Sequence, residues 1–265
     1  MKETIITQIP TECSWRDTLY WFDTIDSTNT QAKLLAAQGA PHGTLILASH
    51  QTAGRGRMGR SYFSPAGNGI YLSLILRPQC RAEELMHLTC AAAVAALDAV
   101  QKATGLRPGI KWINDMVAQG RKLGGILTEL SVDPGTELVQ YAVVGIGINC
   151  YGGLEHFPTP IRDIAISLET VIGNRPDYAA LAAQLILALW RMDQKITNEK
   201  DTIMDTYRED CITLGHEVKI LRDGNPTGIA VDIDSNGALL VRFSDGRLET
   251  VNSGEVSVRG LYGYI

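Results

Sequence analysis

Glycines and arginines alternate over one short stretch of the chain, Gly54–Arg60, which holds three of each around a single methionine. No Asp or Glu occurs between Ser27 and Ala82, although the whole chain carries a formal net charge of -5. Glycines let a backbone approach a ligand closely, and arginine guanidinium groups match the oxygens of carboxylates and phosphates. The stretch therefore predicts a pliable loop that closes over a small anion.

Two other interpretations of this loop stay open. A flexible basic surface loop would carry the same residues, but it would normally have acidic neighbours. An RNA-binding Gly-Arg segment is usually longer, with many repeats or interleaved aromatic residues. Both are weaker than an anion-binding loop because the positive charge has no acidic counterpart nearby.

A second polar cluster spans residues 111–115 and 121–127. Lys122 is followed by two glycines, where its ammonium can meet an oxyanion close to bare backbone. A lysine that only flanks a hairpin explains the same pattern equally well. Asp115 is a candidate ligand of Mg²⁺, or an acceptor of backbone hydrogen bonds in a turn at Asn114–Asp115.

Two further segments offer polar groups at the ends of predicted elements. Residues 27–29 (Ser-Thr-Asn) precede a helix, where they can bind a polar ligand group or simply cap the helix. Asn149 follows a strand with alternating glycines, so it faces a nucleotide or forms a strand-end turn.

The composition is that of a globular protein with one sizeable core and room for a small second domain: 265 residues, 45% apolar and 20% charged. Mild acidity argues against a protein that coats nucleic acid, and no apolar run is long enough to span a membrane. The N-terminus lacks a basic region followed by an apolar one, the mark of a secretion signal. Five unclustered cysteines predict reduced thiols and a cytoplasmic protein.

Hydrophobic periodicity and turn residues predict the elements that position these groups. Strands are expected over residues 15–22, 44–49, 69–76, 123–131 and 138–146. Helices are expected over 30–38 and 82–104, after a cap at Asp177, and over 200–209, with a loop at 151–160. Past Cys211, four short strands with tight turns (218–221, 229–233, 239–243 and 248–251) predict a small β-barrel of about 50 residues. The predicted domains are 1–212 and 213–265.

Together these segments resemble the biotin–protein ligase family, the biotin–[acetyl-CoA-carboxylase] ligases. The residues that carry the resemblance, in chain order, are Ser27-Thr28-Asn29, Gln51 to Arg57 with Gly59-Arg60, Phe63-Ser64-Pro65, Lys111 to Asp115, Arg121 to Leu127 and Gly147-Ile148-Asn149. Residues 254–259 look like part of the family's SH3-like C-terminal domain. The resemblance covers nearly the whole chain, with Tyr62 at a position where tryptophan is common and Ile113 where proline is common.

The resemblance implies an α+β fold: a mixed, largely antiparallel sheet with packed helices, of the class II synthetase type, and a small C-terminal SH3-like barrel. It implies ATP-dependent biotinylation of a lysine on a biotin carboxyl carrier protein through biotinyl-5′-AMP, with Mg²⁺ and no tightly bound prosthetic group. About fifteen residues precede the first predicted strand. That is too short for a helix-turn-helix domain, so a ligase-only form that does not bind DNA is expected.

The resemblance also implies roles for individual residues. The catalytic residues are Lys122, Arg55 and Arg57. Biotin is bound by Ser27, Thr28, Asn29, Gln51, Arg55, Gly56, Arg57, Lys122 and Gly125, and ATP by Arg57, Arg60, Lys111, Asn114 and Asn149. Asp115 is the candidate Mg²⁺ ligand, and Glu255 and Arg259 either reach back to the ATP site or are exposed charges of the barrel.

Two alternative functions stay open at this point. A lipoate–protein ligase uses the same adenylate chemistry on another aliphatic carboxylate. A non-catalytic module would sense biotin with the first domain and bind a partner with the barrel. A homodimer also stays open, since exposed sheet edges can pair two chains.

Overall fold

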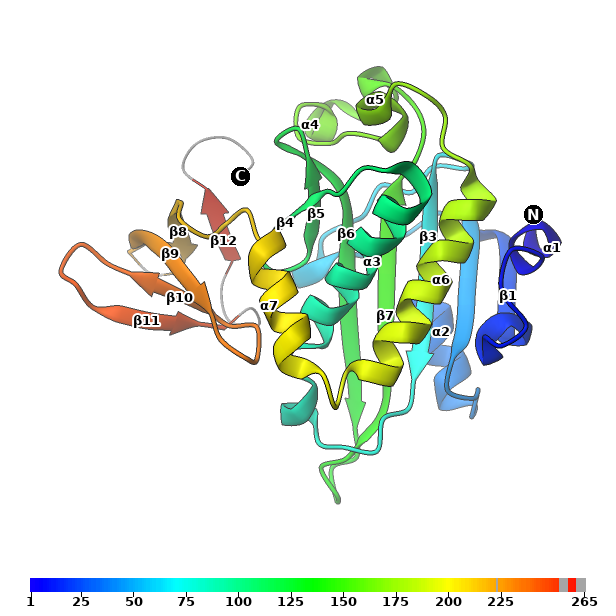
Figure 1. Cartoon of the computed structure of the whole chain (residues 1–265), viewed down its shortest axis with the longest axis horizontal. Coiled ribbons are helices and arrows are strands. Elements are labelled where there is room, and N and C mark those ends of the chain that lie inside the picture. Colours follow the sequence, from blue (N-terminus) through cyan, green and yellow to red (C-terminus); the bar gives the residue numbers. More distant parts are fainter. Residues whose placement is uncertain (223, 253–256, 261–265) are drawn as a thin grey trace.

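A seven-stranded sheet with the order β1-β2-β3-β7-β6-β5-β4 forms the centre of the protein, whose computed structural model describes residues 1–222, 224–252 and 257–260 (Figure 1). β1 and β2 pair in parallel and the other neighbours are antiparallel, so the sheet is mixed and largely antiparallel, as predicted. Its strands are β1 (Leu19–Ile25), β2 (Thr44–Gln51), β3 (Gly69–Leu76), β4 (Gly109–Lys111), β5 (Asp115–Ala118), β6 (Arg121–Val132) and β7 (Val139–Asn149).

Helices cover both faces of this sheet. On one face lie α3 (Leu88–Thr104), α6 (Tyr178–Lys195) and α7 (Lys200–Asp210), and α2 (Thr28–Ala37) lies on the other (Figure 1). α3 packs against β5, β6 and β7 and also against the neighbouring helices α6 and α7, which explains why its sequence is apolar nearly all round. Ala32 and Ala36 of α2 pack on the opposite face of the sheet. The short helices are α1 (Lys2–Ile6), α4 (Thr159–Arg162) and α5 (Leu168–Ile172).

Two elements begin later than the sequence predicts. The expected strand from Trp15 starts at Leu19, because the Thr18 hydroxyl donates to the Trp15 carbonyl at 2.8 Å and closes a 3₁₀ turn. The helix expected from residue 82 starts at Leu88. A separate 3₁₀ turn, Ala82–Leu85, comes before it, and its N-terminal side is closed by a hydrogen bond from the backbone N–H of Arg81 to Glu84.

Two predicted connections also differ from the structure. Asp115 is not in a turn: it is the first residue of β5, paired with Lys111 on one side and Gly125 on the other. The turn lies over residues 112–114 instead. The predicted loop at 151–160 holds a 3₁₀ turn, Leu154–His156, and the start of α4.

The C-terminal strands form a second, antiparallel sheet with the order β11-β10-β9-β8-β12. They are β8 (Glu217–Leu221), β9 (Thr227–Ile233), β10 (Leu239–Arg242), β11 (Leu248–Val251) and β12 (Ser257–Gly260), the last of which was not predicted. Trp112 Nε1 donates to the Gly237 carbonyl at 2.9 Å, and Arg208 Nε donates to the Ile233 carbonyl at 2.7 Å. These two hydrogen bonds connect the C-terminal sheet to α7 and to the turn that follows β4. The division after residue 212 stays a prediction.

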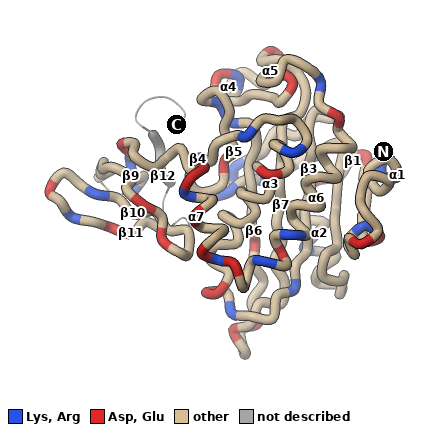
Figure 2. Tube along the Cα trace, viewed as in Figure 1, with Lys and Arg blue, Asp and Glu red and all other residues tan. Residues whose placement is uncertain are grey.

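Acidic and basic residues are interspersed along the chain trace rather than separated by sign over the whole molecule (Figure 2). Among the described residues, no helix combines the length and the apolar character that a membrane crossing requires.

The packing of α3 predicts the effect of a truncation in the core. Leu97 is fully buried, so Leu97→Ala should lower the free energy of unfolding by about 3 kcal/mol, measured by urea denaturation. Leu34 on α2 is 51% exposed, and Leu34→Ala should change stability by less than about 0.5 kcal/mol. Equal effects of the two substitutions would contradict the described packing.

Candidate active site

A cavity of about 850 Å³ lies over β6 and β7, between the N-terminus of α2 and the Gly54–Arg60 loop. Every residue predicted for the site lines it: Ser27, Thr28, Asn29, Gln51, Arg55, Gly56, Arg57, Arg60, Lys111, Asn114, Asp115, Lys122, Gly125 and Asn149. The folding of the chain thus brings together segments more than a hundred residues apart. The cavity is large enough for a ligand of drug size or more.

Glycines form the floor of the cavity. Gly125 of β6 pairs with Gly147 of β7, and Gly145 lies two residues before Gly147 on the same strand. A Cβ atom on Gly145 would overlap the side-chain amide of Asn29, and one on Gly147 would lie 2.5 Å from Cε1 of Tyr62. Because real Cβ atoms do not approach so closely, both side chains can pack here only over bare backbone.

The Gly54–Arg60 loop folds back on itself beside the cavity. Gly56 N–H donates to the Arg60 carbonyl at 2.7 Å, and Tyr62 N–H donates to the Gly54 carbonyl at 2.8 Å. Met58 at the tip has φ of 56° and is 62% exposed. The loop is therefore held by a few internal bonds, with its apolar tip in solvent.

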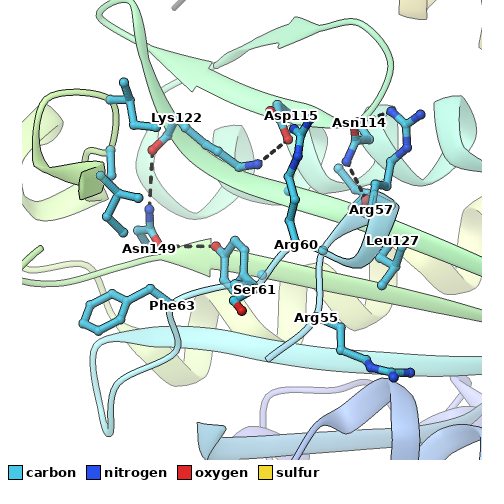
Figure 3. Close-up of a pocket in the computed structure, with 18 of the residues that line it drawn as sticks. Arg55, Arg57, Arg60, Ser61, Phe63, Asn114, Asp115, Lys122, Leu127 and Asn149 are labelled. Atoms are coloured by element: carbon cyan, nitrogen blue, oxygen red, sulfur yellow. Dashed lines mark hydrogen bonds and ion pairs between the residues drawn. The ribbon is translucent and has the colours of Figure 1, made fainter. Parts of the chain in front are cut away.

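The three arginines of the loop do not point the same way. Arg57 and Arg60 extend toward Asn114 and Asp115, whereas Arg55 extends in the opposite direction (Figure 3). Arg57 Nη1 donates to Asn114 Oδ1 at 3.0 Å, and burial lowers the pKa of the Arg57 guanidinium. Arg55 is exposed.

Lys122 of β6 and Asp115 of the neighbouring strand β5 form an ion pair in the lining of the cavity. Lys122 Nζ lies 2.5 Å from Asp115 Oδ1, and both side chains are largely buried (Figure 3). An anion that enters the cavity can approach Lys122 on its remaining N–H groups, since an ammonium carries three donors.

Asn149 holds the end of β7 in place beneath this cationic end. Its Nδ2 donates to the carbonyl of Ile166 at 3.1 Å, and its Oδ1 accepts from the Tyr62 hydroxyl at 3.2 Å. Tyr62 is the aromatic residue at the position where the family commonly has tryptophan, and its hydroxyl adds a hydrogen bond that an indole there could not make in the same way.

Amide and hydroxyl groups gather at the other end of the cavity. Gln51 Oε1 accepts from the backbone N–H of Thr28 at 2.8 Å and lies 3.0 Å from its hydroxyl. Gln51 Nε2 donates to Ser64 Oγ at 2.8 Å. Ser27 caps α2 by accepting from the Thr30 N–H at 3.5 Å. Uncharged hydrogen-bond donors and acceptors therefore line this end, and the charge of Arg55 also reaches it, since it acts on Glu129 beside Asn29.

Several residues at the site were missed from the sequence. Ser73 of β3 donates to Asn29 Oδ1 at 2.6 Å, and Glu129 of β6 accepts from Asn29 Nδ2 at 2.9 Å. The signal for Ser73 was present, since it is a lone serine in the otherwise apolar run of β3. Segment 161–165 also lines the cavity, and the backbone N–H of Lys122 donates a hydrogen bond to the carbonyl of residue 164. No pattern in the sequence predicts that contact.

The acidic side chains that line the cavity are Asp115 and Asp163. Within the described ranges, no group of three or more His, Cys, Asp or Glu is arranged to hold a metal ion. Mg²⁺ is commonly bound by one or two carboxylates together with phosphate oxygens of a substrate, and Asp115 fits that donor set. Glu255 lies outside the described residues, and of Arg259 only its place in β12 is described.

Comparisons with known proteins identify the family of the chain. Residues 21–149 match the model of the biotin/lipoate A/B protein ligase family, and residues 213–259 match that of the biotin protein ligase C-terminal domain. The first of these families includes ligases for biotin and ligases for lipoate.

Individual relatives narrow the class. A biotin–[acetyl-CoA-carboxylase] ligase of Paracoccus denitrificans is 36% identical over 89% of this chain and 98% of that protein. A bifunctional ligase/repressor of Bacillus subtilis is 36% identical over 86% of this chain and 70% of that protein. The solved structure of a biotin protein ligase from Aquifex aeolicus, in complex with biotin and ATP, has a TM-score of 0.77 and 29% identity, covering 91% of this chain and 98% of that one. The chain belongs to the biotin protein ligase family.

The few internal bonds of the arginine loop lead to a prediction about its dynamics. In the ligand-free protein, amide hydrogens of residues 55–61 should exchange much faster than those of the flanking strands β2 and β3, because few packed side chains hold the loop. Hydrogen–deuterium exchange read by mass spectrometry measures this. Protection of the loop equal to that of the strands would contradict a lid that opens when the cavity is empty.

Proposed function

We propose that this protein attaches biotin to a lysine of a biotin carboxyl carrier domain in two steps. First, a carboxylate oxygen of biotin attacks the α-phosphorus of ATP, and pyrophosphate leaves as biotinyl-5′-AMP forms. Second, the ε-amine of the carrier lysine attacks the acyl carbon, AMP leaves with the bonding electrons, and the amine gives up a proton. The observation that carries this proposal is a single cavity with uncharged polar groups at one end and cations at the other.

The uncharged end suits the ureido ring of biotin. Ser27, Thr28 and Gln51 present hydroxyl and amide groups there, and Asn29 supports them from α2. These groups can match the carbonyl and N–H groups of a cyclic urea. The bare backbone of Gly125 lets the valeryl chain pass close to β6 on its way to the cations.

The cationic end suits the reaction itself. A carboxylate and a polyphosphate repel each other, so their encounter needs fixed positive charge. In this proposal Lys122 meets the biotin carboxylate and the acyl phosphate, and Arg57 and Arg60, which line the same cavity, meet the phosphates. Arg55 can join them only when the loop closes with a different side-chain direction from the one described.

The remaining nucleotide contacts are assigned to three residues that line the same end. Asn149 and Asn114 offer side-chain amides, and Lys111 offers a further cation. Asp115 would hold Mg²⁺ together with phosphate oxygens, and the ion would supply charge neutralisation on the polyphosphate. Asp115 would bind the ion with the same carboxylate that pairs with Lys122. Nucleotide binding would therefore weaken the ion pair between Asp115 and Lys122.

Water exclusion is the role we assign to the Gly54–Arg60 loop. The adenylate is a mixed anhydride that hydrolyses in water, and an ordered loop over it would keep it intact until the carrier lysine arrives.

A carrier domain as acceptor, a cytoplasmic setting, a homodimer and the absence of DNA binding belong to the same proposal.

Lipoate is the nearest alternative substrate, because the matched family model includes lipoate ligases. The polar end of the cavity favours biotin, since a dithiolane ring has no N–H or carbonyl to pair with Thr28 and Gln51. Pyrophosphate exchange into ATP should therefore depend on biotin and not on lipoate. Exchange that is supported by lipoate alone would favour the alternative.

Removal of one cation tests the proposed reaction. Lys122→Ala should lower the rate of biotin transfer to a lysine-bearing carrier domain by roughly 10²–10³-fold, because a preorganised charge on the developing transition state is lost. The measurement is the mass increase of the carrier during incubation with biotin, ATP and Mg²⁺.

A matched lysine serves as the control. Lys102 lies on α3, is exposed and does not line the cavity, so Lys102→Ala should transfer biotin at the wild-type rate. Normal transfer by Lys122→Ala would reopen the interpretation of the chain as a non-catalytic biotin-binding module.

A further inference from the structure

The turn between β9 and β10, residues 234–238, packs closely against the segment that follows β4 and against α3. Gly237 in this turn has φ of 88°. A Cβ atom on Gly237 would lie 2.7 Å from Sγ of Cys90 on α3 and 3.6 Å from Cδ1 of Ile113. The turn keeps its own shape through hydrogen bonds to the side chain and carbonyl of Asp234. Bare backbone at residue 237 therefore allows a shaped turn to fit against the large sheet and its helices.

Trp112 connects this turn to the cavity. Its indole Nε1 donates to the Gly237 carbonyl at 2.9 Å, and its backbone N–H donates to Thr213 Oγ1 at 2.9 Å. Trp112 is 6% exposed and lines the cavity. A buried indole N–H usually takes a hydrogen-bond partner. The position of the turn therefore sets where the Trp112 ring lies in the cavity wall.

The polar residues beside Trp112 are held in a different way. Asn114 Nδ2 donates to the Ile126 carbonyl, and the Ile126 N–H donates to the Asn114 carbonyl, both at 2.8 Å. Lys111 pairs with Asp115 in the ladder between β4 and β5. Because these bonds do not involve the turn, a displaced turn acts on the cavity through the Trp112 wall. In the sequence Trp112 lies between Lys111 and Asn114, the residues assigned to ATP, so this wall belongs to the nucleotide end.

We propose that residues 234–238 are positioning residues for the nucleotide end of the cavity and act through Trp112, so that docking of this turn and binding of the nucleotide favour each other. This inference rests on the proposed function, in which ATP occupies that end. Coupling between two binding events is reciprocal. If the docked turn holds the wall that the nucleotide meets, a bound nucleotide must also stabilise the docked turn.

Two glycines in turns of the same sheet test the role of the turn. Gly237→Ala adds a Cβ that pushes the turn away from Cys90, so it should raise KM for ATP about fivefold and leave KM for biotin within about twofold, measured by pyrophosphate exchange. Gly246 in the turn between β10 and β11 has φ of 84°, and no described atom lies within 4 Å of an added Cβ. Gly246→Ala carries a similar backbone strain without the displacement, so both constants should stay at the wild-type values.

Two tryptophans test the hydrogen bond itself. Trp112→Phe keeps an aromatic wall but removes the N–H that bonds Gly237, so it should raise KM for ATP about threefold in the same assay. Trp21 on β1 also donates from Nε1, to Asp23 Oδ1 at 3.0 Å, and lies outside the lining of the cavity. Trp21→Phe should leave the KM values for ATP and biotin unchanged.

These four variants can overturn the positioning role. An unchanged KM for ATP in both Gly237→Ala and Trp112→Phe, or an equal rise in KM for biotin, would do so. An equal rise in KM for ATP in Gly246→Ala would also do so, because strain in any turn of the sheet would then explain the effect. If Gly237→Ala does not fold, Trp112→Phe decides alone.

Alkylation of Cys90 tests the reciprocal effect of the nucleotide on the turn. Cys90 is fully buried beside Gly237, so displacement of the turn should expose its thiol to iodoacetamide. Adding a non-hydrolysable ATP analogue with Mg²⁺ to the biotin-bound protein should slow alkylation of Cys90 about fivefold, measured by peptide mass spectrometry. Cys13 is also buried but follows α1 in the N-terminal segment, and its rate should not change. Equal slowing of both cysteines, or no slowing of Cys90, would overturn the coupling.

The proposed function and the coupling fail separately. Wild-type protein that makes no biotinyl-5′-AMP from biotin and ATP refutes the proposed function. Normal adenylate formation by the wild-type protein, with wild-type KM values for ATP in Gly237→Ala and Trp112→Phe, refutes only the positioning role of the turn.

Discussion

The close approach of side chains to bare backbone on β6 and β7 is the constraint on which the rest of the site depends. Gly145 and Gly147 leave room for the Asn29 amide and the Tyr62 ring, which could not lie where they do over any larger residue. Asn29 in turn orients the uncharged end of the cavity, and Tyr62 bonds the residue that closes β7. Two glycines thus set the position of groups at both ends of one cavity.

Charge is divided along this cavity in a way that suits the chemistry. Lys122, Arg57 and Arg60 lie at one end of the cavity, where Lys122 forms an ion pair with Asp115. Side-chain amides and hydroxyls lie at the other end. The long segment without acids, from residue 27 to 82, supplies the arginines and also the polar groups of α2. That segment contains no carboxylate, and Asp115, the acidic residue whose charge acts on Arg57, comes from β5.

The sequence predicted most of the strands, and every residue it assigned to the site lines the cavity, because glycine, arginine and cap residues have strong local meanings. α6 begins after Asp177, whose side chain accepts from the Ala180 N–H at 3.0 Å, as expected of a helix cap. Asp115 was placed in a turn because Asn-Asp is a turn signal, but pairing with β4 and β6 overrides that local preference. The roles predicted for these residues in binding biotin and ATP stay predictions. The position of the residues around one cavity is consistent with those roles.

Long-range partners could not be predicted in the same way. Glu129 looks like a solvated charge on an alternating strand, and only the fold brings it within 2.6 Å of Lys33 and beside Asn29. The start of α3 was missed because a buried His87, bonded to the carbonyl of Ile196 at 2.9 Å, interrupts an apolar run that reads as one helix. Both depend on contacts between segments about a hundred residues apart, which hydrophobic periodicity does not encode.

The central claim is that one cavity binds the vitamin and the nucleotide together, with the cations at their junction. Calorimetric titration with a non-hydrolysable analogue of biotinyl-5′-AMP, compared with biotin alone, tests it most directly. The account predicts that the analogue binds at least about a hundredfold more tightly than biotin, because it occupies both ends of the cavity and meets Lys122 and Arg57. Binding of the analogue no tighter than that of biotin would contradict it.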